Sequence, residues 1–461
     1  MQKGSRIRIA AFIGLVLAIP ASAWAADSRG AADDTAAILR RLESLEAQNR
    51  GFAQQIAALE RRNAELQASL QTSQTAPAAI ATSADAPPAT GATSSPGGAS
   101  GPATTPASGT EVKAQATSAS LDWLSRVSFA GDFRYRHENI DDTQATEDRT
   151  RETIRARLSA KLKIADAIDG EIGIATGGSD PRGGSATLGA ASSRKSIGLD
   201  LGYVRWRPRE DVAVIAGKMR QPFVRPASSF FIDNELRPEG VALTYNGANG
   251  VFGSAYHYWL EERPASTDST LLAGQLGWAG GSDALKVTLG ATYYDYGSVQ
   301  GQSPDFADGL VHEFGNSVTG SGAAAVYTYD YDIGELSAEA TLKTADIPIN
   351  VFVDYAHNFA ADDGLADAYN LGVFIGKANA PGRWEFGVVH QVVEKDALFG
   401  QWIDSDFGGG VTDNAGQFYR LAWMPLQRVV LNLNYYDTSY NVDVGNETDY
   451  DRWQLDFNFT F

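Results

Sequence analysis

From Leu121 to the end of the chain, the sequence contains aromatic-rich segments of about 8 to 15 residues in which apolar and polar residues alternate with a period of two. The last segment is the clearest case, because every second residue from Trp453 to Phe461 is apolar and those between are charged, amide or hydroxyl residues. Successive side chains of a β-strand point to opposite faces, so the pattern predicts strands with one apolar and one polar face. Sixteen such strands are predicted, near residues 127–138, 149–163, 168–176, 197–208, 212–219, 240–246, 251–259, 271–278, 284–295, 330–343, 348–358, 367–378, 383–393, 415–424, 427–438 and 450–461.

The connections between these segments alternate between short and long. Seven are tight turns, such as 165–167 and 425–426, and eight are long loops rich in Asp, Ser and Gly, such as 177–196 and 296–329. Outer-membrane barrels have short periplasmic turns and long outer loops, whereas a soluble β-sandwich does not separate loop lengths in this way. We therefore predict an all-β transmembrane barrel of about 16 antiparallel strands, with a range of 14 to 18.

Four tryptophans favour the membrane barrel over a soluble fold. Trp206, Trp278, Trp384 and Trp423 each lie within about two residues of a predicted short turn. Aromatic residues gather at both membrane interfaces of such barrels, whereas tryptophans that fill a soluble core would lie in the middle of strands. The four positions therefore predict an aromatic girdle at the periplasmic interface.

The first 118 residues have a different pattern. Basic residues precede an apolar run from Ile9 to Ile19, and small residues up to Ala25 follow it, which is typical of a secretory signal peptide cut after Ala25 or Ala23. An uncleaved anchor would need a longer apolar run. The segment 71–118 is almost entirely Ala, Ser, Thr, Pro and Gly and predicts a disordered linker. The predicted domains are a signal peptide (1–25), a coiled-coil segment (26–70), the linker (71–118) and the barrel (119–461).

Residues 38–70 form a heptad repeat, in which the steps between seam positions alternate between three and four residues. Asn49 and Asn63 occupy two a positions, where a polar residue lowers stability but specifies register and strand number. We expect an α-helical coiled coil in the periplasm that self-associates, as a trimer or as a dimer; an amphipathic helix packed on the barrel or on a soluble partner is the alternative. The predicted oligomerisation residues are Leu42, Leu45, Asn49, Phe52, Ile56, Leu59, Asn63 and Leu66.

The composition limits the partners and the kinds of site that the protein can have. The chain has 56 acidic and 38 basic residues, a net charge of -18 and no cysteine. The acidic excess argues against nucleic acid as a partner, and the lack of cysteine excludes thiolate metal sites and thiol nucleophiles. Five histidines are scattered without the spacing of a metal site or a catalytic triad. We expect no enzyme activity, no cofactor and no metal, and we interpret loop acids such as Asp404 and Asp406 as solvated charge, with divalent cations at the lipopolysaccharide surface as the alternative.

Two segments are candidates for the pore. The segment 149–163 has a basic face, which we expect to line the lumen because a charge on the lipid face costs about 2 to 4 kcal/mol. Arg134 and Arg136 of the segment 127–138 extend it to a basic stripe on one wall. The connection 220–239 contains three prolines and a pair of phenylalanines, so we expect it to fold into the lumen; an extracellular loop packed on its neighbours is the alternative. The candidate pore-lining and constriction residues are Arg134, Arg136, Arg155, Arg157, Lys161, Lys163, Arg220, Arg225, Asp233, Glu235, Arg237 and Glu239.

These charges have two interpretations that are compatible with each other. A basic wall opposite the acids of the third loop would set a transverse field that orders dipolar solutes and tunes ion selectivity. The same residues could form a structural ladder of salt bridges inside the barrel.

Several segments of the barrel resemble the bacterial Putative porin family. They are Gly217–Phe223 (GKMRQPF), Phe231–Asp233, Arg237–Leu243, Ile349–Asn358 and the terminal Phe461. The resemblance covers the barrel and implies a sixteen-strand, trimeric porin whose Phe461 is the signal read by the barrel-assembly machinery. Phosphate-selective porins share the basic stripe and the coiled coil, but this chain has no dense lysine cluster to match an anion funnel.

The leading hypothesis is an outer-membrane porin, a water-filled channel for passive diffusion of small hydrophilic solutes and ions. Its partners would be outer-membrane lipid and lipopolysaccharide, other copies of itself and the assembly machinery. The alternatives are a phosphate- or anion-selective porin, and an envelope tether whose coiled coil contacts peptidoglycan. A hydrolase is the third class, but no serine or histidine of the sequence stands out as its nucleophile or base.

Overall fold

The computed structural model describes residues 125–461 except 265, 306–311, 345–346 and 363. The predicted signal peptide, coiled coil and linker, with the oligomerisation residues from Leu42 to Leu66, lie outside the described residues.

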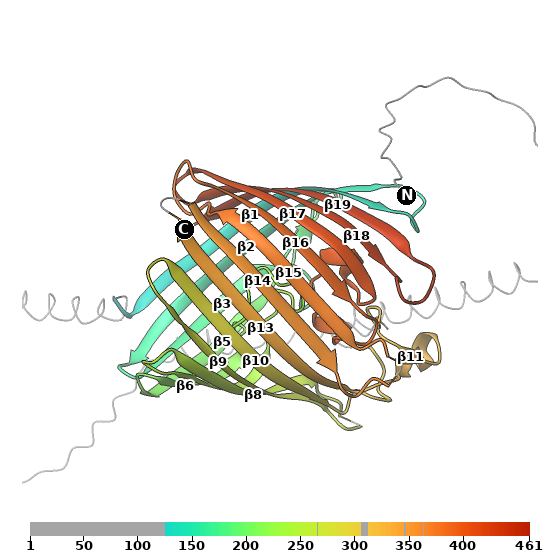
Figure 1. Cartoon of the computed structure of the whole chain (residues 1–461), viewed down its shortest axis with the longest axis horizontal. Coiled ribbons are helices and arrows are strands. Elements are labelled where there is room, and N and C mark those ends of the chain that lie inside the picture. Colours follow the sequence, from blue (N-terminus) through green and yellow to red (C-terminus); the bar gives the residue numbers. More distant parts are fainter. Residues whose placement is uncertain (1–124, 265, 306–311, 345–346, 363) are drawn as a thin grey trace, which may run out of the picture. The chain divides into compact units, whose positions relative to one another are not determined.

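The described part of the chain forms a closed antiparallel β-barrel (Figure 1). Sixteen strands pair with their neighbours in sequence order, and β1 also pairs with β19, which closes the ring. The strands are β1 (Val127–Asp142), β2 (Arg149–Ala165), β3 (Ile168–Thr176), β5 (Ile197–Arg209), β6 (Val212–Lys218), β7 (Glu239–Asn246), β8 (Val251–Glu261), β9 (Ser269–Gly281), β10 (Leu285–Gly297), β13 (Tyr331–Thr344), β14 (Ile347–Asn358), β15 (Asp367–Gly376), β16 (Trp384–Val393), β17 (Asn414–Leu426), β18 (Val429–Tyr440) and β19 (Thr448–Thr460).

Short elements occur within three of the long loops. The two-residue strand β4 (Ala186–Thr187) pairs with β2, and β11 (Val318–Thr319) pairs with β12 (Val326–Tyr327). The short 3-10 helices are η2 (Gly322–Ala324), η3 (Gly400–Trp402) and η4 (Phe407–Gly410). No helix in the described residues is long and apolar enough to cross a membrane.

Each of the sixteen predicted segments corresponds to a strand of the barrel. The main differences are at strand ends: β1, for example, continues to Asp142, four residues beyond its predicted end, because it pairs with β19 up to Tyr450. There the polar residues of both faces obscure the alternation, while the hydrogen-bonded ladder continues.

The outer face of the barrel is apolar. Large side chains such as those of Ile172 and Leu199 are 56% and 60% exposed there. The four tryptophans near the short turns are also exposed, by 50% for Trp206, 38% for Trp278, 45% for Trp384 and 48% for Trp423. A band of apolar side chains bounded by aromatic residues is the surface that a barrel presents to lipid.

Much of the interior is filled by apolar side chains. One cluster joins inward-facing residues of β8, β9, β10 and β13 to residues of the loops that follow β6 and β16, and it includes Tyr258, Tyr296, Tyr331, Phe399 and Trp402. A second, smaller cluster lies against β14 to β18. Its packing is tight, because a Cβ added at Gly387 would lie 2.1 Å from the ring of Phe374. The inward faces of β19, β1, β2 and β3 carry charged residues instead.

Candidate functional site: the polar half of the lumen

The loop between β6 and β7, residues 219–238, crosses the lumen and is called the crossing loop below. Its Val224 N–H donates to Gln275 Oε1 on β9 at 2.9 Å, and Ser229 Oγ donates to Asp354 Oδ2 on β14 at 2.7 Å. The ring of Phe230 lies 5.1 Å from that of Phe418 on β17. The crossing loop therefore reaches from the strands that it connects to the opposite side of the ring of strands.

The local sequence of the crossing loop suits this path. Three prolines restrict its backbone, and Met219 N–H donates to the carbonyl of Pro238 at 2.9 Å, which closes the neck of the loop. Phe230 and Phe231 are buried, at 7% and 2% exposure. A loop with so many buried apolar side chains is stabilised by burial within the barrel rather than by water.

A second loop, residues 394–413 between β16 and β17, also folds inward and is called the inner loop. The N–H of Asp233 on the crossing loop donates to the carbonyl of Trp402 at 2.8 Å, and Ser405 N–H donates to Asp233 Oδ2 at 3.0 Å. Asp404 N–H donates to the carbonyl of Phe230 at 3.3 Å. The two loops are therefore joined through backbone and side-chain hydrogen bonds.

The position of the inner loop contradicts the interpretation of the sequence, in which Asp404 and Asp406 are solvated charges on an outer loop. That interpretation is wrong, because the Asp406 carboxylate lies 2.9 Å from the guanidinium of Arg136 and 2.9 Å from that of Arg452. Loop length and charge suggested an exposed segment, but the apolar residues Leu398, Phe399 and Trp402 pack on the strands and carry the acids inside.

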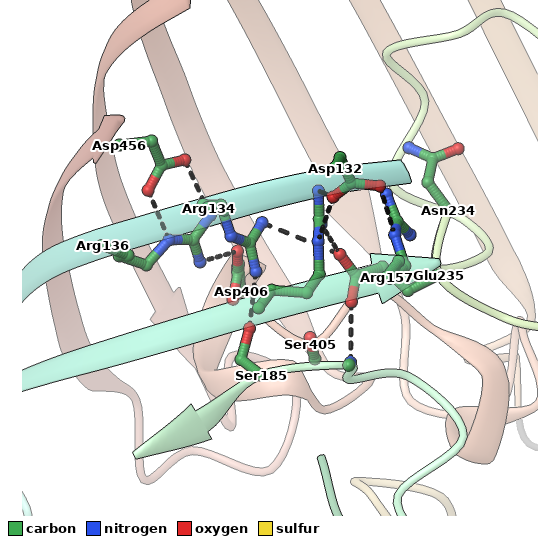
Figure 2. A network of polar contacts seen from close by, with 12 residues as sticks. Asp132, Arg134, Arg136, Arg157, Ser185, Asn234, Glu235, Ser405, Asp406 and Asp456 are labelled. Carbon is green, nitrogen blue, oxygen red and sulfur yellow. Dashed lines mark hydrogen bonds and ion pairs between the residues drawn. The ribbon is translucent and has the colours of Figure 1, made fainter. Parts of the chain in front are cut away.

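The polar half of the lumen is a wall of arginines on β19, β1 and β2, interleaved with carboxylates (Figure 2). Arg136 Nε donates to Asp456 Oδ1 at 2.6 Å and Nη2 donates to Asp456 Oδ2 at 3.0 Å. Arg452 Nε donates to Glu138 Oε2 at 2.9 Å. Two-pronged contacts of this kind fix the orientation of a guanidinium as well as its charge.

The crossing loop meets this wall through Glu235. Its carboxylate pairs with Arg155, lies 3.7 Å from Arg134 and accepts the N–H of Gly184 at 2.8 Å. Arg155 also pairs with Asp132 at 2.8 Å, and Arg157 Nε donates to the same carboxylate at 2.8 Å. The predicted residues Arg134, Arg136, Arg155 and Arg157 thus meet the predicted Glu235 in one network, together with carboxylates from the wall itself.

The other predicted residues lie elsewhere. Arg220 pairs with Glu171 on β3 at 2.6 Å, and Lys161 and Lys163 are exposed toward the short-turn end of β2. Arg225 lies 3.6 Å from Glu335, Arg237 lies 3.6 Å from Asp200, and Glu239, the first residue of β7, pairs with Lys218 at 2.8 Å. The structure therefore spreads Arg220, Arg225 and Arg237 along the crossing loop and leaves the other three charges on strands, so these residues do not meet at one constriction.

Sequence reasoning missed several carboxylates of the network. Asp132 and Glu138 lie on the same face of β1 as Arg134 and Arg136, and Asp456 pairs across to β1 in register with Arg136. The period of two alone would have assigned these three residues to the polar face. Asp406 could not have been found in this way, because it lies in a loop.

The loop carboxylates have opposite pKa shifts. Burial and the neighbouring Asp404 raise the pKa of Asp233, and burial and Asp406 raise the pKa of Asp404 to about 7. Burial also acts on Glu235, but Arg155 and Arg134 outweigh it and lower its pKa to about 2. The pKa of Asp406 is lowered because Arg452 and Arg136 outweigh the effect of burial. The contact between the two loops therefore contains two acids that take up protons readily, Asp233 and Asp404, beside two that stay ionised, Glu235 and Asp406.

A series of polar cavities follows the charged wall. One of them has a volume of about 470 Å³ and is lined by residues such as Arg134, Thr153, Asn234 and Asp406. It shares Glu235 with a cavity of about 220 Å³, which in turn shares Arg237 with a cavity of about 230 Å³ beside the crossing loop. Arg237 also borders a cavity of about 390 Å³, but Phe399 and Trp402 of the apolar half line that one as well. These shared residues outline a polar route past the crossing loop.

The chain ends beside the start of β1. Phe461 N–H donates to the carbonyl of Gly131 at 3.0 Å, and the reverse bond is 3.1 Å long. The ring of Phe461 is 61% exposed.

Comparison with known proteins gives one family match. Residues 140–319 match the family described as Putative porin. No curated protein matches the chain.

Solved structures give matches at low sequence identity. The high-pH structure of OprB from Pseudomonas putida is 12% identical, with a TM-score of 0.52, over 76% of this chain and 97% of that chain. OmpF of Salmonella typhi in complex with daunomycin is 11% identical, with a TM-score of 0.46, over 73% and 97%. A mutant of the Rh. blastica porin is 13% identical, with a TM-score of 0.43, over 73% and 100%. The chain therefore matches the Putative porin family over residues 140–319, within a sixteen-strand barrel that has the fold of bacterial outer-membrane porins.

Proposed function

We propose that this protein is an outer-membrane porin through which small hydrophilic solutes and ions diffuse passively. The observation that carries the proposal is the division of the lumen. Apolar side chains fill the half next to β8–β10 and β13, while a series of polar cavities follows the charged wall of β19, β1 and β2. Water and ions are favoured only where polar groups line the route, so solutes pass on the charged side.

Because the chain has no cysteine, single cysteine substitutions can map the route. Asn234 is exposed and lines the 470 Å³ cavity. We expect the full-length protein to give conductance steps in planar bilayers, and Asn234→Cys to lose most of its current when a bulky thiol reagent is added. Asn446→Cys, on an exposed outer loop, is the matched control and should keep its current.

The absence of conductance steps in the unmodified protein would overturn the proposal. Equal current loss in both cysteine variants would instead show that the polar half is not the route.

We also propose that the protein assembles as a homotrimer through residues 38–70. The heptad seam with Asn49 and Asn63 supports self-association with a fixed strand number. Chemical crosslinking of the full-length protein should give trimers, and the double substitution of Asn49 and Asn63 by leucine should broaden the distribution of oligomers. Monomers alone in the unsubstituted protein would contradict the proposal.

A further inference from the structure

Arg134 is the least well paired arginine of the wall. Arg136 pairs with Asp456 and Asp406, and Arg155 pairs with Asp132 and Glu235. Arg134, between them, forms an ion pair only with Glu235, at 3.7 Å, among the residues that the structure describes, and that carboxylate is already engaged by Arg155. Its recorded hydrogen bond is from Nη2 to Ser185 Oγ at 2.7 Å, as Figure 2 shows.

The Nε of Arg134 is buried and has no hydrogen-bond partner among the described residues. The whole side chain is only 13% exposed. A buried donor of a charged group that finds no acceptor costs free energy, so the site favours any acceptor that can reach it.

A second donor without a partner in the described chain lines the same cavity. Thr153 on β2 is 4% exposed, and its Oγ1 is buried without a recorded hydrogen bond. Thr153 is the register partner of Arg136, and Arg155 is the register partner of Arg134. Arg134 and Thr153 therefore lie on adjacent strands of one wall, and both line the 470 Å³ cavity.

We propose that Arg134 and Thr153 form a subsite that binds a small oxyanion, a carboxylate or a phosphate, as it passes through the pore. A guanidinium presents donors in a planar arrangement that matches such anions, and a hydroxyl can donate a further hydrogen bond. The volume of about 470 Å³ is within the range of small-molecule sites. The inference deepens the proposed function and rests on it.

The surrounding acids define the selectivity of the subsite. Asp456 and Asp406 are engaged by Arg136, and Glu235 by Arg155, so the attraction of those arginines is largely neutralised. Binding then depends on directed hydrogen bonds from Arg134 and Thr153. An oxyanion that accepts several hydrogen bonds is held more strongly than chloride.

The experiment is single-channel recording of the full-length protein in potassium chloride, with sodium succinate or inorganic phosphate added. We expect each anion to reduce the chloride current in a saturable way, and comparison of the two separates carboxylate from phosphate preference. Arg134→Gln should raise the half-blocking concentration about tenfold or more, because a hydrogen bond to a charged group is lost. Thr153→Val, which is similar in shape, should raise it by about two- to tenfold.

Arg207→Gln is the matched control. It removes the same charge from a nearby strand, but Arg207 on β5 pairs with Asp169 at 2.6 Å and does not line this cavity. Its half-blocking concentration should stay within about twofold of the unsubstituted protein. Arg134→Lys keeps the charge but loses the planar donors, and an intermediate effect is expected.

Each outcome is decisive. A conducting protein whose current does not saturate with either anion, or equal effects of Arg134→Gln and Arg207→Gln, would overturn the subsite while leaving the porin function intact. A protein that does not conduct at all would overturn both. An unchanged chloride conductance in Thr153→Val shows that the barrel has folded, so a weaker block in that variant is a property of the subsite.

Discussion

The two halves of the lumen are lined by the same kind of strand but are filled in opposite ways. On β8–β10 and β13 the inward positions hold tyrosines such as Tyr258 and Tyr296, which pack against Phe399 and Trp402 of the inner loop. On β19, β1 and β2 the inward positions hold arginines and carboxylates beside polar cavities.

The difference shows that alternation defines the barrel, whereas the chemistry of its inward residues decides where water can pass. A ring of sixteen strands encloses more space than the inward side chains alone would fill. In this protein two loops fill the excess on one side, since their apolar residues are removed from water there. On the other side, the same loops meet charged groups and leave polar space.

The largest expected effect is a loss of stability when a ring is removed from the apolar half of the lumen. Phe399→Ala removes a ring that is 2% exposed and lies 4.9 Å from Tyr296 and 5.6 Å from Tyr331. We expect the free energy of unfolding to fall by about 3 to 5 kcal/mol, because a buried aromatic ring is replaced by a cavity. Urea unfolding of the protein in lipid vesicles measures this loss.

The control is Phe359→Ala, because the ring of Phe359 is 65% exposed and a smaller loss is expected. The single-channel conductance of Phe399→Ala should stay unchanged. A large increase in conductance would show that the apolar half is not a filled wall.

The second largest expected effect is a loss of stability in the charged half of the lumen. Asp406→Ala leaves Arg136 and Arg452 with Asp456 and Glu138 as their recorded carboxylate partners. We expect a loss of about 2 to 3 kcal/mol, less than for a fully buried partner because Asp406 is 21% exposed. Unfolding in urea measures the loss, and an altered single-channel conductance is expected here but not for Phe399→Ala.

The matched control for this change is Asp180→Ala. Asp180 pairs with Arg182 of its own loop and is 52% exposed. Its substitution should therefore lower the free energy of unfolding by about 1 kcal/mol or less. Equal losses for the two substitutions would show that the inner loop is not held by the arginine wall.

The smallest effect concerns pH at the contact between the loops. Burial and Asp406 raise the pKa of Asp404 to about 7, whereas an unfolded aspartate titrates near 4. The folded state therefore binds more protons between about pH 4 and 7, so the stability contributed by neutral Asp404 is present below pH 4 and lost as the pH rises through 7. When Asp404 ionises, the contact between the loops can open and let water reach the carboxylate. We therefore expect the stability of the folded state to fall by only about 1 to 2 kcal/mol.

Asp404→Asn should abolish this part of the pH dependence. Current noise recorded from single channels at pH 5 and pH 8 measures the opening, and more frequent fluctuations are expected at pH 8 in the unsubstituted protein. Identical noise at both values would contradict the assignment of Asp404 as the titrating group.

Much of the candidate site followed from the sequence. The alternation in β1 and β2 predicted that Arg134, Arg136, Arg155 and Arg157 share the inward face, and the prolines and phenylalanines of 220–239 predicted a loop that folds into the lumen. The structure adds the partners of these residues, of which Asp406 comes from a loop more than two hundred residues away in sequence.

The sequence by itself determined the strands and their two faces, and it put their number at about sixteen, because alternation is a local property that each segment carries without its neighbours. Only the tertiary structure decided which loops lie inside and which side of the lumen they fill. The inner loop has the length and charge of an exposed segment, and its place depends on apolar contacts with strands and loops remote in sequence. The weak pairing of Arg134 was decided in the same way, since Asp406, Asp456 and Glu235 engage its neighbours only once the barrel has closed and the two loops have folded inward.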